Sequence, residues 1–330
     1  MARYIVRRVL WSIVLLVIVS AVVFTIFYIF PSADPAQLRA GRQANADQIA
    51  AIRESLGLDK SVPEQFWIYI KGVFTPFDLP GTDAHGPLYF GRSYQSNADV
   101  FDVIKSDLPA TGLLVLGAVI LWLSIAIPVG VISAIKRRSL LDRTTMITTL
   151  AFISAPVFWL GLVALYLFAD DVGVIPIFPG IGSYATADTF IAKCGTMLLP
   201  WGVLAAATAA IYARYLRSQM IDVMGEDYIR TARAKGLPER TVITRHALRS
   251  AITPIVTLLG LDVAILLAGN AILTETVFNI PGVGNETFNA IKRSDLPMIQ
   301  GITLFGAFFI VTFNLIVDIA YAYLDPRVRY

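Results

Sequence analysis

The chain has 330 residues, of which 56% are hydrophobic and 15% charged, and its mean hydropathy of +0.66 exceeds that of ordinary soluble domains. Its formal net charge of +3 gives no indication of a nucleic-acid partner. The high hydropathy indicates a membrane protein. The single Cys194 excludes an internal disulfide, and the two histidines are too far apart in sequence to suggest a metal cluster, so we expect neither a metal nor a cofactor.

Six apolar runs are long enough to cross a bilayer as helices, which takes about 20 residues. They are continuous in aliphatic residues and phenylalanine, whereas the strands of a membrane barrel would alternate apolar with polar residues. The sequence therefore predicts an all-α membrane protein with six transmembrane helices. Their expected bounds are residues 9–30, 109–135, 144–169, 197–215, 254–278 and 298–324.

The first run follows three basic residues, an arrangement that a signal peptide would share. The run is longer than the core of a signal peptide, about 7–15 residues, and no convincing small-residue cleavage site follows it. We therefore interpret residues 1–30 as a cytoplasmic amino terminus and the first span.

The segment between the first two spans, residues 31–108, carries ten acidic and seven basic side chains. Without a positive excess it is predicted to lie outside the cytoplasm, as an insertion of short helices folded against the membrane. The basic residues gather elsewhere: 17 of the 27 lie at the two chain ends and in the loops after the second and fourth spans. Both termini are therefore predicted to be cytoplasmic, and residues 109–330 to form a five-helix core.

The cytoplasmic connection at residues 216–250 is predicted to fold as two short helices joined at a sharp corner. Acidic residues open the first helix, basic residues close it, and a glycine can take the left-handed conformation that ends it. The residues concerned are Glu226, Asp227, Arg233, Lys235 and Gly236. Pro238 suits the first position of the second helix. Such a knob could transmit force to the flanking spans, although any multi-span protein also places basic residues in its cytoplasmic loops.

This connection resembles the EAA loop of binding-protein-dependent ABC importers. Gly236 takes the place of the family's glycine, but Arg230, Thr231 and Ala232 stand at the Glu-Ala-Ala positions, so only Ala232 matches. Residues 227–237 have the sequence Asp-Tyr-Ile-Arg-Thr-Ala-Arg-Ala-Lys-Gly-Leu. This sequence is similar to that of the dipeptide and oligopeptide permease branch, which also includes nickel and glutathione permeases.

The resemblance to this branch extends over nearly the whole chain, and the long insertion is similar to that of its B-type subunit. Further matching segments are residues 2–8, 56–60, 107–111, 275–278, 281–284, 295–297, 300–301 and 324–329.

The resemblance implies the type I ABC importer fold in a bacterial inner membrane. Two such permeases would enclose one path, with two ATPase subunits on the cytoplasmic side and a substrate-binding protein outside. The chain would then be no enzyme, because ATP hydrolysis belongs to its partners. Peptides are the expected substrate, with glutathione and nickel left open. The residues implied to couple to the ATPase are Glu226, Asp227, Arg230, Ala232, Arg233, Ala234, Lys235 and Gly236.

Three carboxylates within the predicted spans, Asp262, Glu275 and Asp318, are candidates for the translocation path, because such groups are costly in lipid and usually face a cavity or a partner. Asp262 could meet a cationic amino terminus, or it could make a structural bond between helices. The same carboxylates would also suit an ion-coupled secondary transporter or channel, the alternative function. That class of protein has no need of a glycine-cornered knob.

Overall fold

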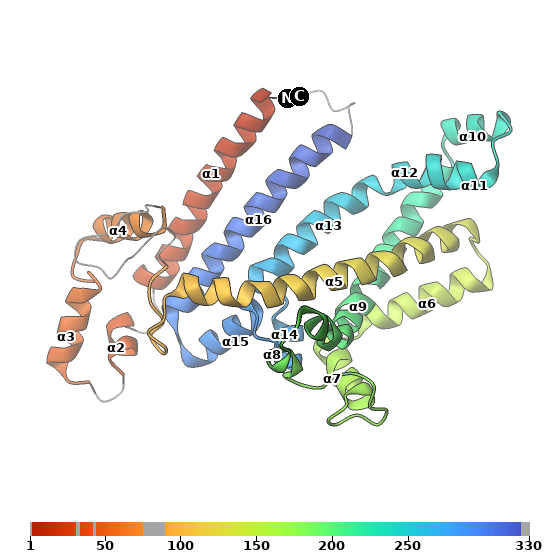
Figure 1. Ribbon diagram of the computed structural model, residues 1–330. Coiled ribbons are helices and arrows are strands. Elements are labelled where there is room, and N and C mark those ends of the chain that lie inside the picture. The colour runs from red at the N-terminus through yellow and green to blue at the C-terminus, as the bar shows by residue number, and fades with distance from the viewer. Residues whose placement is uncertain (1, 31–33, 42–43, 75–89, 325–330) are drawn as a thin grey trace.

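The computed structural model describes residues 2–30, 34–41, 44–74 and 90–324, and within these ranges the chain is helical apart from its connections (Figure 1). The β pairings found there are two isolated bridges, Arg92 with Asp99 and Ala169 with Phe178. Part of the predicted insertion, residues 75–89, and most of the carboxyl-terminal match at residues 324–329 lie outside the described residues.

Five helical stretches in the described part of the chain are long and apolar enough to span a membrane. They are Ile5–Ile29, Val100–Ile135, Phe190–Met224, Thr253–Asn270 and Leu296–Ile319. A bent pair of helices, α6 (Leu140–Ser154) and α7 (Val157–Phe168), makes a sixth span if it is counted as one. The prediction of an all-helical membrane protein is confirmed, with six spans on this count.

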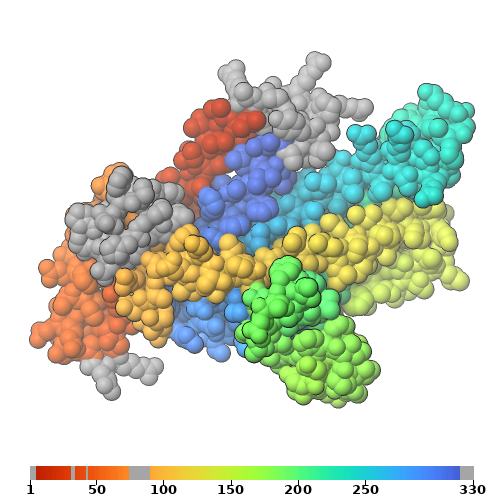
Figure 2. Space-filling model, viewed as in Figure 1, coloured from red at the N-terminus to blue at the C-terminus, as the bar shows by residue number. Residues whose placement is uncertain are grey.

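The third span differs from its prediction, residues 144–169, because α6 and α7 meet at 101° instead of forming one straight helix. Pro156 stands at the bend. It has no N–H to continue the helical ladder, and its ring restricts Ala155 to extended backbone, with φ −83° and ψ 126°. The region of α7 consequently projects from the body of the molecule (Figure 2).

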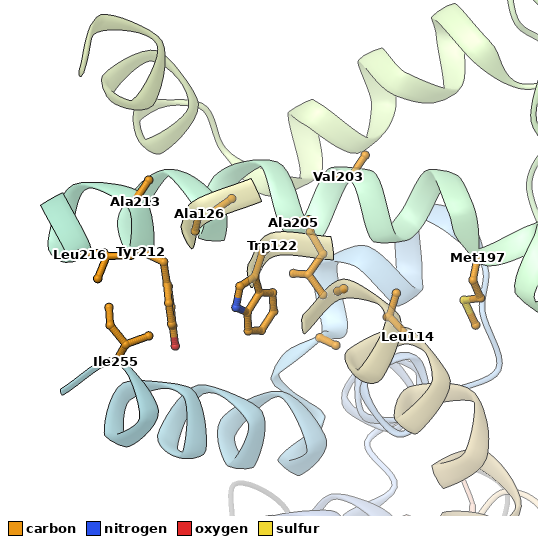
Figure 3. Packing of buried hydrophobic residues seen from close by; sticks show 14 of the residues in the cluster. Leu114, Trp122, Ala126, Met197, Val203, Ala205, Tyr212, Ala213, Leu216 and Ile255 are labelled. Atoms are coloured by element: carbon orange, nitrogen blue, oxygen red, sulfur yellow. The ribbon is translucent and has the colours of Figure 1, made fainter. Parts of the chain in front are cut away.

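The centre of the fold is the packing of α5 (Val100–Ile135) against α9 (Phe190–Met224). Both helices extend beyond their predicted spans, because polar residues at their ends suit a helix as well as apolar ones do. Small residues let the two backbones approach: a Cβ on Gly117 would lie 1.9 Å from Cε2 of Trp201. Buried side chains from both helices meet there, including Trp122 and Tyr212, which point toward α13 (Thr253–Ile265) (Figure 3).

The fifth span, predicted over residues 254–278, is broken. The chain runs from α13 through η3 (Leu266–Asn270) into a separate helix, α14 (Ile272–Phe278). Gly269 makes the turn with φ 95°, a conformation that favours glycine. The turn is packed tightly, since a Cβ on Gly284 would lie 2.8 Å from the Gly269 carbonyl oxygen.

The last helix, α16 (Leu296–Leu324), packs along α1 (Ala2–Phe24) and α13. The described part of the inserted segment contains short helices at one end of α1, and Phe24 packs edge-on against Phe66 with ring centroids 5.2 Å apart. The remaining elements are η1 (Thr25–Ile29), α2 (Pro35–Ala40), α3 (Ala46–Ser55), α4 (Val62–Phe74), α8 (Ser183–Thr186) and α15 (Val283–Arg293).

The molecule has two distinct ends (Figure 1). One end holds the start of α1, the end of α16 and the connection between α9 and α13. The other end holds α2, α3, α4 and α15. The elements predicted to be cytoplasmic therefore lie together, away from the predicted external insertion.

Candidate functional site

The connection after α9 folds as the predicted knob. It comprises α10 (Asp227–Ala234), α11 (Glu239–Thr241), η2 (Val242–Ala247) and α12 (Leu248–Ala251). Gly236 forms the corner with φ 77°, and its N–H donates to the carbonyl oxygen of Arg233 at 2.9 Å. A Cβ on Gly236 would meet nothing within 4 Å, so the position requires glycine for its backbone conformation and not for space. Pro238 caps the second helix and does not begin it, one residue away from the prediction.

The knob is packed into the core of the protein. Ile229 is fully buried and Ala232 is 7% exposed, and both belong to the same apolar cluster as α5 and α9. The Tyr228 hydroxyl lies 2.9 Å from the Ser250 hydroxyl and ties α10 to α12. Knob and spans are therefore one mechanical unit. Of the two predicted packing alanines, Ala232 packs inside the chain, whereas Ala234 lies on the surface.

The charged residues of the knob differ in their surroundings. The Arg233 guanidinium spans the corner and donates to both carboxylate oxygens of Glu239, at 2.7 and 3.1 Å. This pair holds the pKa of Glu239 below its ordinary value. Arg230 makes a looser pair with Asp227, at 3.3 Å, in which both side chains are largely exposed. Lys235 is exposed as well, so the outer face of α10 presents cations around a small residue.

The three predicted path carboxylates are not gathered in one site, because each bonds to different elements. Asp262 on α13 accepts a hydrogen bond of 2.6 Å from the Tyr212 hydroxyl on α9. Asp318 on α16 pairs with Arg8 on α1 at 3.0 Å, where both side chains are partly exposed. These two carboxylates each connect a pair of helices.

Glu275 is fully buried and caps the amino-terminal end of α15. Its carboxylate accepts hydrogen bonds from the Thr111 hydroxyl at 2.7 Å and from the Asn285 N–H at 2.9 Å. The Thr111 oxygen in turn accepts from the Val283 N–H at 2.9 Å. Two side chains from α14 and α5 thus satisfy N–H groups that a helix start leaves without partners.

Close packing around Glu275 explains why a glycine, Gly282, stands next to this site. A Cβ on Gly282 would lie 2.5 Å from the Glu275 carboxyl carbon. Three of the matching sequence segments, residues 107–111, 275–278 and 281–284, therefore meet at one cap.

Sequence reasoning missed a buried ion pair at the knob end of the molecule. Arg217 on α9 donates to both oxygens of Asp142 on α6, at 2.6 and 2.8 Å. Arg217 was grouped with the basic residues of a cytoplasmic loop, and no role was predicted for Asp142. No local pattern connects two residues so far apart in sequence.

Two hollows lie beside α6. One, of about 570 Å³, sits at the elbow with α7 and is lined by apolar residues such as Phe152 and Trp159. The other, of about 390 Å³, is a groove between α5, α6 and α9. Neither is lined by Asp262, Glu275 or Asp318.

Comparisons with known proteins cover the whole chain. Residues 126–330 match the family model described as binding-protein-dependent transport system inner membrane component, and residues 1–129 match its amino-terminal counterpart. The chain is 37% identical over 330 residues to a glutathione transport system permease protein, GsiC, of Salmonella typhi. It is 36% identical over 350 residues to a dipeptide transport system permease protein, DppB, of Alkalihalophilus pseudofirmus. Each alignment covers all of both chains.

Proposed function

Because the chain belongs to the family of binding-protein-dependent transport system inner membrane components, we propose that it forms half of a translocation path for short peptides and couples that path to ATPase subunits. It is an integral, multi-pass permease subunit of an ABC importer. ATP hydrolysis takes place on separate subunits, and an extracytoplasmic binding protein delivers the substrate.

The observation that carries the coupling proposal is the construction of the knob. Its inner face, with Ile229 and Ala232, is buried in the core, so a displacement of α10 must displace α9. Its outer face offers Arg230, Ala234 and Lys235 to a partner. A small residue between cations suits close docking against an acidic groove of an ATPase. The other expected coupling residues, Glu226, Asp227, Arg233 and Gly236, shape α10 and its corner.

The membrane orientation that we propose places the knob and both termini in the cytoplasm. The start of α1 and the connection between α9 and α13, both rich in basic residues, lie at this end of the molecule, in agreement with the positive-inside rule (Figure 1). The insertion with α2, α3, α4 and the capped helix α15 then face the binding protein.

Peptides are the proposed substrates because relatives named for dipeptides and for glutathione, itself a short peptide, align over the whole chain. Asp262 is the proposed contact for a cationic amino terminus. It is half-buried, on a helix facing the Trp122 and Tyr212 side chains (Figure 3). Glu275 and Asp318 are engaged in a helix cap and an interhelical pair, so they do not form a chain of sites with Asp262. This separation argues against the alternative of an ion-coupled transporter.

The test is to purify a tagged chain from native membranes and identify the co-purifying proteins by mass spectrometry. An Ala234→Glu variant places a bulky anion on the outer face of α10 without touching the core. Ala185→Glu, at an exposed alanine of α8, is the matched control. We expect the parent and the control to retain a second permease and ATPases, and Ala234→Glu to lose the ATPases. Recovery of the parent alone, with transport driven by an ion gradient, would overturn the proposal.

A further inference from the structure

The helix α6 packs along one face, mainly against α9, and its buried charged attachment lies in its first turn. Among its residues, Asp142 and Thr149 are buried, whereas Leu140 is 79% exposed and Ile147 is 67% exposed. Asp142 lies in the first turn, at the same end of the molecule as the knob. A helix with so little buried surface depends strongly on the few contacts that it makes.

The attachment at Asp142 is a fully satisfied carboxylate. It accepts two hydrogen bonds from the Arg217 side chain of α9, at 2.6 and 2.8 Å, and one from the Arg138 N–H at 2.9 Å. It also accepts a hydrogen bond from the hydroxyl of Ser133, which is fully buried on α5. Donors from α5, from the turn and from α9 therefore converge on one side chain. A bidentate guanidinium–carboxylate pair fixes both distance and angle, so it resists sliding of α6 along α9.

Beyond this attachment a groove of about 390 Å³ lies along the seam between α5, α6 and α9. Threonines of α6 line one wall and alanines of α9 the other: Thr144, Thr145, Thr148, Thr149, Ala206, Ala209, Ala210 and Ala213. Small side chains with free space between them permit a change in helix angle without a clash. The structure thus combines a bidentate ion pair in the first turn of α6 with a seam of small side chains along the rest of the helix.

Arg217 also lies on the direct route from the knob. Helix α9 ends at Met224, a single glycine follows, and α10 begins within three residues of α9. We propose that the Asp142–Arg217 pair is the joint through which movement of the knob and α9 reaches α6 and α7. This inference rests on the proposed coupling function and assigns Asp142 and Arg217 as positioning residues within it.

The test uses the complete importer in proteoliposomes, with ATP hydrolysis and substrate uptake measured on the same preparation. The variants are Arg217→Gln and the double variant Asp142→Asn with Arg217→Gln, which leaves no unpaired charge if a single change prevents folding. Arg214→Gln is the matched control, because Arg214 is an exposed arginine of the same helix. Arg217→Lys keeps the positive charge but loses the planar pair of donors that binds both carboxylate oxygens of Asp142.

We expect both Arg217→Gln and the double variant to assemble and hydrolyse ATP, while uptake per ATP falls by roughly 5- to 150-fold, the range of a coupling free energy. Arg217→Lys should keep part of the parent's ratio of uptake to ATP hydrolysis, and Arg214→Gln should have the same ratio as the parent. A purely structural pair would instead lower yield and melting temperature with the ratio unchanged, and that result would overturn the inference. If the parent shows no ATP-driven uptake, the proposed function itself fails.

Discussion

Replacement of Thr111 by valine tests whether a side chain of α5 holds α15 in place. The substitution keeps the shape and removes the hydroxyl, so the Glu275 carboxylate loses a donor and the Val283 N–H loses its acceptor. Each unsatisfied buried group costs about 1–3 kcal/mol. Glu275 keeps its bond from the Asn285 N–H, so we expect a loss of about 2–4 kcal/mol concentrated at the start of α15.

Hydrogen exchange measured on the protein in nanodiscs reports this local loss directly. A loss of about 3 kcal/mol corresponds to exchange more than 100-fold faster, which we expect for the amides of residues 283–285. Thr208→Val is the control, because the Thr208 hydroxyl donates only to Leu204 within its own helix, at 2.9 Å. Equal exchange at residues 283–285 in Thr111→Val and the parent would refute the capping argument.

Three further predictions concern the coupling corner and the path. Gly236→Ala should cost about 1–2 kcal/mol of local stability, measured by exchange across α10, because φ is 77° and nothing obstructs the new methyl group. Arg233 holds the pKa of Glu239 below its ordinary 4.5, so the pair stabilises the corner above that value and this contribution should vanish as the pH falls through the lowered pKa. Protection of α10 followed from pH 6 to pH 3 should show this loss, and Arg233→Gln should abolish it. Asp262→Asn keeps an acceptor for the Tyr212 hydroxyl and removes the charge, so uptake assays should show a higher KM for peptides with a free amino terminus and an unchanged KM for acetylated ones.

Each of these predictions has a matched control. Gly225→Ala places the same methyl group at a glycine with φ −83°, and it should leave the protection of α10 near that of the parent. Tyr212→Phe removes the hydrogen bond of Asp262 without removing its charge. If Tyr212→Phe raises KM for both kinds of peptide as strongly as Asp262→Asn does, Asp262 serves the packing of α9 and α13 and makes no substrate contact.

The apolar runs were sufficient to predict the number and approximate places of the spans, because a helix in lipid needs about 20 mainly apolar residues, but they did not predict the bend in the third span or the break in the fifth. The knob was predictable for a similar reason: end charges and the glycine are local signals, and Gly236 takes the conformation that they indicate. Pro156 is an equally local signal, for a bend in a helix. It stands inside a continuous apolar run, however, and the length of that run led to the prediction of one straight span.

The features that were missed depend on contacts between distant parts of the chain. Gly269 turns the fifth span with a positive φ, and Gly284 packs against its carbonyl oxygen. In the sequence alone, a glycine that breaks a helix looks the same as one that a continuous helix tolerates. Glu275 was a candidate for the path, and its role as a helix cap could not be predicted because the groups that donate to its carboxylate come from residues 111 and 285. The pairing of Asp142 with Arg217 is likewise a property of the folded chain only.

The elbow at Pro156 has a consequence for the surrounding lipid. Helix α7 has 12 residues and is about 18 Å long, whereas the hydrocarbon core is about 30 Å thick. Because α7 turns away from α6 by 101°, the pair advances across the bilayer mainly over the length of α6, about 22 Å for 15 residues. If α6 and α7 form one span, this side of the protein is shorter than the hydrocarbon core, and either local thinning of the bilayer or a neighbouring subunit in place of lipid would relieve the mismatch.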